Sequence, residues 1–182
     1  MRKNNIHGGG KRTNEHGLTF EGRTNFIDSI KNNKNFNVSQ IRNFNKSFKI
    51  YFKNKKIGFY AEKNEFYKLL FKGKSGWKKL ISKQYLPDAV FINEINKTVY
   101  IIEKKFQARA GSVDEKLQTC DFKRKIYTKI VSNCKKKYET KYYFLLSSWF
   151  EKKEYNDVKD YINSVGCKYF INKIDLIELG LT

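Results

Sequence analysis

The stretch LPDAVFINEINKTVYIIEKKFQ, residues 86–107, decides the fold of this chain. Two expected strands, 89–92 and 98–106, flank the polar sequence NEINK, and this pattern predicts a β-hairpin. The only proline of the chain, Pro87, stands just before the first strand, where it need not donate a hydrogen bond to the sheet. The segment is therefore expected to contribute a pair of antiparallel strands to a sheet.

Side chains alternate between the two faces of a strand, so the second strand sorts its residues into two sets. Glu103, Lys105 and Gln107 emerge together on one face as the strand leaves its apolar run. A short hairpin brings Asp88 level with Glu103, with the two side chains about 5 Å apart. We therefore expect two carboxylates and a lysine to converge at one end of the hairpin.

Two close carboxylates repel each other, and a hard cation relieves that repulsion. Mg²⁺ binds oxygen ligands and keeps several of its waters. We expect Asp88 and Glu103 to bind Mg²⁺, with the backbone carbonyl of Lys104 as a further ligand. Lys105 would lie beside the attacking water, which it can orient while stabilising the developing negative charge. The pattern predicts metal-assisted hydrolysis of a phosphodiester.

The order Pro87-Asp88, then Glu103-Lys104-Lys105, resembles the PD-(D/E)xK nuclease superfamily, and the extension to Gln107 occurs in several of its branches. The segments 8–21 and 103–119 further resemble small type II restriction endonucleases. The resemblance implies an α/β (α+β) fold, with a central mixed β-sheet flanked by helices in a restriction-endonuclease-like core.

The same resemblance implies cleavage of double-stranded DNA that leaves 5′-phosphate ends. In that superfamily an acid on the first core helix often assists the metal site, and Glu21 is where this sequence would place it. A type II enzyme is expected to be a homodimer that cuts a short, (pseudo)palindromic site. Its genetic partner would be a cognate DNA methyltransferase that protects the host.

The composition agrees with a nucleic-acid partner. The 182 residues suit one domain, and the formal net charge of +20 attracts nucleic acid. The apolar runs are too short for a spanning helix, so we expect no membrane contact. Three widely spaced cysteines and no secretory signal predict a cytoplasmic protein with free thiols. Abundant Lys and Asn point to a bacterial, mycoplasmal or phage genome.

The rest of the chain predicts a mixed sheet with helices on its faces. Residues 1–13 are expected to form a flexible basic arm, either disordered or reaching DNA, and residues 14–182 a single nuclease domain. A capping box at 112–115 opens one helix, which is expected to break near Thr119. Helices are expected at 14–31, 64–72, 76–84, 112–138 and 153–165, strands at 48–52, 57–61, 89–92, 98–106, 142–146 and 168–171, and a helical turn at 174–179.

Several residues close after the hairpin have side chains that can read bases in a DNA groove, because Arg, Lys and Gln carry suitable donors and acceptors. The basic runs 123–125 and 135–137 are expected to contact phosphates, which position a protein without reading sequence. The expected DNA-binding residues are Gln107, Arg109, Lys116, Gln118 and Arg124.

Each assignment has a plainer alternative. Asp88 could be an ordinary turn residue after proline, and Glu103 with Lys105 a solvated strand end. Glu21 could be a helix-surface acid and Gln107 a surface amide. The function has alternatives too: a structure-specific nuclease of the junction-resolvase or repair type, or a basic nucleic-acid-binding protein without catalysis.

Overall fold

The computed structural model describes residues 19–20, 24, 26–72, 76–108, 113–134 and 136–181. They contain a seven-stranded sheet whose spatial order follows the chain. The first five strands pair antiparallel, whereas β5–β6 and β6–β7 pair parallel, so the sheet is mixed as predicted. The strands are β1 (Phe36–Gln40), β2 (Ser47–Phe52), β3 (Lys55–Ala61), β4 (Ala89–Asn93), β5 (Thr98–Lys105), β6 (Glu139–Leu146) and β7 (Lys168–Ile171).

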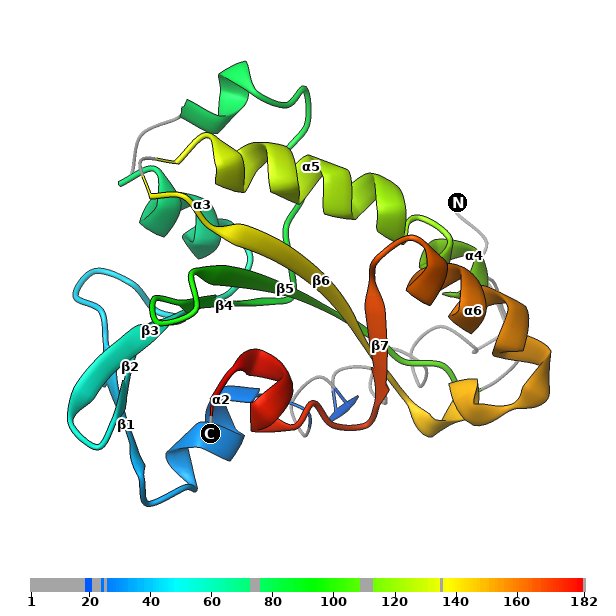
Figure 1. Ribbon diagram of the computed structural model, residues 1–182, viewed down its shortest axis with the longest axis horizontal. Helices are drawn as coiled ribbons and strands as arrows, with labels where there is room; N and C mark the ends of the chain where they lie inside the picture. The colour runs from blue at the N-terminus through cyan, green and yellow to red at the C-terminus, as the bar shows by residue number, and fades with distance from the viewer. Residues whose placement is uncertain are drawn as a thin grey trace, which may run out of the picture.

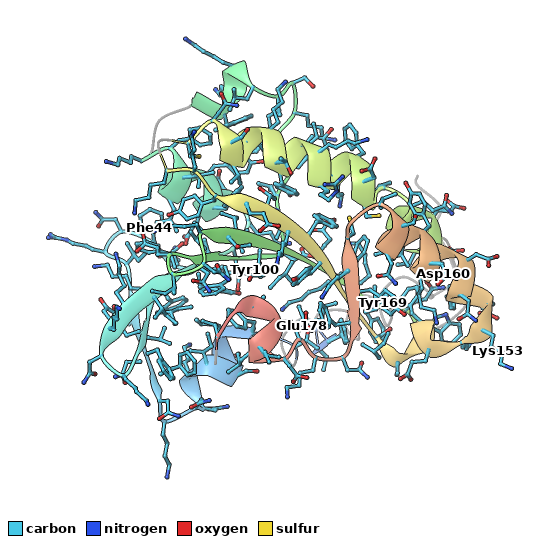
Figure 2. All side chains as sticks on the ribbon, in the orientation of Figure 1. Phe44, Tyr100, Lys153, Asp160, Tyr169 and Glu178 are labelled. Carbon is cyan, nitrogen blue, oxygen red and sulfur yellow. The ribbon has the colours of Figure 1, made fainter. Side chains whose placement is uncertain are left out.

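Helices cover both faces of this sheet (Figure 1), and side chains fill the space between the layers (Figure 2). Four helices lie on one face: α3 (Asn64–Leu70), α4 (Val113–Leu117), α5 (Cys120–Ser132) and α6 (Asn156–Ser164). On the other face lie α2 (Phe26–Lys31) and the 3-10 turn η4 (Leu176–Leu179). The remaining 3-10 turns are η1 (Gly76–Lys79), η2 (Ser148–Glu151) and η3 (Lys153–Tyr155). The predicted fold class is confirmed.

The alternation predicted for the second hairpin strand is present in β5. Val99 and Ile101 pack into the cluster beneath α5, whereas Tyr100 and Ile102 pack into the cluster beneath α2. All four side chains are buried, because the strand is covered on both faces. Glu103, next in the alternation after Ile101, therefore faces α5.

The crossover from β5 to β6 runs through α4 and α5, as a parallel pairing requires. The predicted break near Thr119 is confirmed, since α4 ends at Leu117 and α5 begins at Cys120. Tyr127, Ile130 and Val131 on α5 are buried against the sheet. This packing carries the first turn of α5 towards the end of β5, where Glu103 lies.

Several features differ from the sequence-based expectations, and the helical region expected to extend to residue 138 ends at Ser132. Strand β1 was not predicted; it lies at the edge of the sheet, has only two apolar side chains, Phe36 and Val38, and buries only Phe36. The expected helix at 76–84 shortens to η1. Of the expected helix at 14–31, the described part comprises helical residues 19–20, a turn at Thr24 and α2, while its remaining residues and the arm 1–13 lie outside the described ranges.

The described cysteines are free, as predicted. In the ranges that the structure covers, no helix combines the length and the apolar character needed to cross a membrane.

Candidate active site

The two predicted acids lie on neighbouring strands. Ala89 pairs with Ile102 in the β4–β5 ladder, so the next step of the register sets Asp88 opposite Glu103. Both side chains fall on the α5 face, because Val90 and Ile101, two residues away along their strands, pack into the cluster beneath α5. The convergence expected from the hairpin is therefore present.

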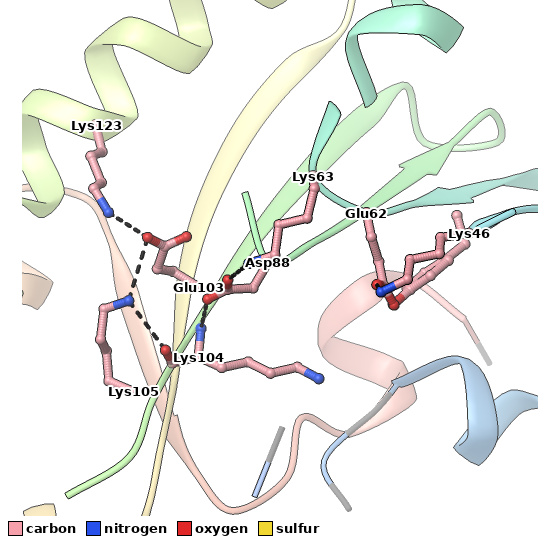
Figure 3. Close-up of polar contacts among 9 residues, drawn as sticks. Lys46, Glu62, Lys63, Asp88, Glu103, Lys104, Lys105 and Lys123 are labelled. Atoms are coloured by element: carbon pink, nitrogen blue, oxygen red, sulfur yellow. Dashed lines mark hydrogen bonds and ion pairs between the residues drawn. The ribbon is translucent and has the colours of Figure 1, made fainter. Parts of the chain in front are cut away.

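Both carboxylate oxygens of Asp88 have partners (Figure 3). Oδ2 accepts a 2.8 Å hydrogen bond from the backbone N–H of Lys104, and Oδ1 forms an ion pair with the ammonium group of Lys63. Only 13% of the Asp88 side chain is exposed. The backbone hydrogen bond fixes the carboxylate beside the end of β5.

Glu103 is 5% exposed, and its two oxygens have different surroundings. Oε1 forms an ion pair with Lys123 of α5 and lies 3.4 Å from Nζ of Lys105. Oε2 is buried and has no hydrogen-bond partner within the described ranges. Burying a charged oxygen without a partner is costly, so Oε2 is suited to a cation.

Lys105 lies beside Glu103, as predicted. Its ammonium group donates a 3.2 Å hydrogen bond to the carbonyl oxygen of Lys104, and only 18% of its side chain is exposed. Lys105 thus contacts Glu103 and the Lys104 carbonyl, two of the oxygen donors expected around the metal. Glu103 and Lys105 do not form the solvated strand end that was the plainer alternative, since both side chains are largely covered.

The wall beneath Glu103 is formed by aromatic side chains. Burial, followed by the negative charge of Glu103, raises the pKa of the hydroxyl groups of Tyr127 and Tyr142. Both phenols therefore stay neutral over the physiological range. A neutral, water-poor wall lowers the local dielectric constant and strengthens the electrostatic interactions of Glu103.

The donor set fits a hard divalent cation. Asp88 and Glu103 supply carboxylate oxygens, the carbonyl of Lys104 adds a neutral oxygen, and Oε2 of Glu103 is open to a further partner. No cluster of three His, Cys, Asp or Glu side chains occurs in the part of the chain that the structure describes. Glu21, the expected third acid, lies outside that part.

The expected DNA-binding residues differ in their surroundings. Gln107 is 4% exposed, and its backbone N–H and C=O groups both bond to the Ser147 hydroxyl. Lys116 and Gln118 are exposed at the end of α4. Arg124 forms an ion pair with Asp121 one turn earlier on α5. Arg109 lies outside the described ranges.

Two lysines at the site were not predicted to contact its acids. Lys123 belongs to a basic run that was assigned to phosphates, and only the packing of α5 shows its ion pair with Glu103. Lys63 lies 25 residues before Asp88, and no local motif marks it. The spacing of residues along the sequence does not indicate either contact.

Comparison with known proteins agrees with this geometry. Residues 14–148 match the sequence model of a family described as a PD-(D/E)XK nuclease superfamily domain. The chain belongs to this superfamily, whose members are nucleases that generally use divalent metals. No match was found among curated proteins, and none among solved structures.

Proposed function

We propose that the protein is a Mg²⁺-dependent type II restriction endonuclease. It would hydrolyse phosphodiester bonds of double-stranded DNA at a short specific site and leave 5′-phosphate ends. The convergence of Asp88, Glu103 and Lys105 at one end of the β4–β5 hairpin carries the proposal. The net charge of +20 supports DNA as the substrate, because phosphate neutralisation dominates affinity for nucleic acids.

Asp88 and Glu103 would hold the Mg²⁺ ion, with the Lys104 carbonyl and Glu21 as further donors. The bound ion would supply Lewis acidity and a water of lowered pKa. The backbone N–H of Lys104 keeps Asp88 in place. Lys105 would donate a hydrogen bond to the attacking water and stabilise charge on the phosphate oxygens. Its contacts with Glu103 and the Lys104 carbonyl support this role.

The finer parts of the proposal rest on the resemblance of segments 8–21 and 103–119 to type II enzymes. These finer parts are that the protein is a homodimer, that its target site is short, and that its genetic partner is a cognate DNA methyltransferase. The DNA-contacting residues would be Gln107, Arg109, Lys116, Gln118 and Arg124.

The proposed nuclease domain spans residues 14–182, with 1–13 as a basic arm. Phe150 and Ile162 pack into the cluster beneath α5, and Leu179 packs into the cluster beneath α2. This packing supports a single domain that continues beyond the matched residues 14–148.

Digestion of plasmid DNA with Mg²⁺ tests the proposal. A discrete set of fragments that depends on sequence is expected, and EDTA should abolish it. Asp88→Asn, Glu103→Gln and Lys105→Met should each lose cutting, whereas Asp175→Asn, which changes an exposed acid paired with Lys173, should retain it. Preferential cutting of branched over linear duplexes would instead identify a structure-specific nuclease. Salt-sensitive binding without any metal-dependent cleavage would overturn the catalytic role.

A further inference from the structure

The ion pair between Lys63 and Asp88 lies at the centre of the site, although Lys63 is not part of the hairpin. Lys63 occupies the turn between β3 and α3, and its ammonium group contacts Oδ1 of Asp88 (Figure 3). The Lys63 side chain is 45% exposed, so its charge is accessible from the surface. A cation thus already contacts one of the two carboxylates that the proposed function assigns to the metal.

The backbone at Lys63 is held in an unusual conformation. Its φ of 48° and ψ of −125° fall in a region that side-chain-bearing residues rarely adopt. Its backbone N–H donates a 2.9 Å hydrogen bond to the carbonyl oxygen of Pro87, the residue just before Asp88. The strained turn and the acid are therefore joined twice, through the backbone and through the side chains.

A divalent cation at Asp88 would compete with the Lys63 ammonium group for the same carboxylate. Oδ1 is bound by Lys63, and Oδ2 accepts the hydrogen bond from Lys104, so each oxygen already has a partner. A cation that binds either oxygen comes close to a like charge, and repulsion is strong at a site that is mostly buried. Glu103 differs, because its Oε2 is open without moving any lysine.

We propose that Lys63 is a positioning residue that competes with the divalent cation for Asp88 and moves to a DNA phosphate when the cation binds. The inference rests on the proposed function, since it needs a metal at Asp88. Lys63 holds Asp88 in place until the cation arrives. The displaced ammonium group, still tethered beside the site, then contacts the incoming phosphate backbone, which couples metal binding to DNA binding.

Calorimetric titration of the DNA-free protein with Ca²⁺ or Mg²⁺ tests the competition. Lys63→Gln should bind the metal about three- to tenfold more tightly than the wild type, as expected for release of one partly exposed ion pair. Lys63→Gly should show the same gain and should fold readily, because glycine tolerates the backbone conformation of this turn. Equal affinities in the wild type and both variants would overturn the competition.

Lys46→Gln is the matched control. Lys46 is also a lysine near this turn, but its ammonium group lies 3.2 Å from Glu62 and makes no ion pair with Asp88. Lys46→Gln removes the same charge as Lys63→Gln, so any gain in metal affinity that arises from net charge alone will appear in both variants. A Lys46→Gln gain equal to that of Lys63→Gln would also overturn the proposal.

The salt dependence of DNA binding tests the second half of the proposal. The measurements use a Lys105→Met background, which keeps both carboxylates and should cleave at least about 10²-fold more slowly than the wild type. With Mg²⁺, Lys63→Gln should lower the slope of log K against log salt by about 0.9, the value of one phosphate contact. Without Mg²⁺ the slope should not change, because Lys63 then binds Asp88. If Lys63→Gln also left the slope unchanged in the presence of Mg²⁺, this half of the proposal would be overturned.

Failure of the proposed function gives a different result. In that case the wild-type protein would bind no divalent cation, or Asp88→Asn would leave its metal affinity unchanged, and the inference would fall with the metal site. Metal binding that needs Asp88 but ignores Lys63 would overturn the inference alone.

Discussion

The backbone N–H of Lys104 donates a 2.8 Å hydrogen bond to the carboxylate of Asp88 across the β4–β5 hairpin. This bond joins Asp88 to Lys104, the residue that directly follows Glu103 in β5. Because a sheet register cannot slip by one residue without turning every side chain to the other face, the relative placement of the two acids is strongly specified. The hairpin thus sets the two carboxylates side by side at one end of β5.

Lys105 is predicted to act on the chemical step more than on DNA binding. Its ammonium group lies beside Glu103 and the Lys104 carbonyl, where it can reach the attacking water. Lys105→Met should lower the single-turnover cleavage rate by about 10²- to 10⁴-fold, the usual contribution of such a group. DNA affinity, measured by fluorescence anisotropy, should change less than tenfold. A cleavage rate close to that of the wild type would contradict this role.

Lys123 is predicted to stabilise the folded protein through Glu103. It forms one of the two ion pairs of a carboxylate that is almost fully buried. Lys123→Met should lower the free energy of unfolding by about 1–2 kcal/mol, with Lys105 limiting the loss. A double-mutant cycle with Glu103→Gln should give a coupling energy of about 1 kcal/mol.

Lys125→Met is the control for Lys123, because Lys125 lies on the same helix and pairs with Asp121 while its side chain is 69% exposed. It should change the unfolding free energy by less than about 0.5 kcal/mol. Equal effects of the two substitutions in urea denaturation would show that the contact with Glu103 contributes nothing to stability.

Gly58 is predicted to be indispensable for the packing of β3 on β4. A Cβ atom at this position would lie 2.1 Å from the carbonyl oxygen of Ile92 and 3.0 Å from the ring of Phe91. Since the first contact is with backbone, Gly58→Ala should destabilise the protein by about 2–4 kcal/mol. Lys56→Ala, on the same strand, should destabilise the protein far less. Thermal melting of the two variants measures the difference. A Gly58→Ala variant as stable as wild type would contradict the close approach.

Glu65 is predicted to make stability depend on pH in the acid range. Desolvation works against its charged form, but hydrogen bonds from the Ser47 hydroxyl and the backbone N–H groups of Asn45 and Lys46 hold the pKa of Glu65 below its usual value. A lowered pKa in the folded state gives stability that is fully present above the unfolded value, about 4.3, and is lost as the pH falls through the folded value.

Glu65→Gln should therefore cost about 1 kcal/mol at pH 7 and progressively less below about pH 4.3. Urea denaturation of both proteins between pH 3 and 7 measures this difference. Glu115→Gln, which changes an exposed acid on α4, serves as the control and should show no such trend. A constant difference between wild type and Glu65→Gln across this range would contradict the assignment.

The hairpin and its acids could be predicted because they depend on local rules. Alternation with a period of two fixes which side chains share a face, and a short turn fixes the register, so Asp88 and Glu103 were placed opposite each other from spacing alone. The buried strands β4, β5 and β6 are also nearly continuous apolar runs, which makes them easy to recognise.

The contacts that the sequence did not predict are those set by tertiary packing. Lys63 and Lys123 are two of 38 basic residues, and only the folded chain shows which of these reach an acid of the site. Strand β1 joins the sheet through pairing with β2 and buries a single side chain, so its own sequence carries little signal. The role of Glu21 remains a prediction.

Diffraction from crystals soaked in Mn²⁺ tests most directly whether the hairpin holds a catalytic metal. An anomalous difference peak is predicted within ligand distance, about 2.0–2.3 Å, of a carboxylate oxygen of Asp88 and of Oε2 of Glu103, with the Lys63 ammonium group moved away from Asp88. Crystals of Asp88→Asn should lose the peak. A peak bound elsewhere, or an Asp88–Lys63 ion pair that persists in Mn²⁺ with no peak beside it, would contradict the account.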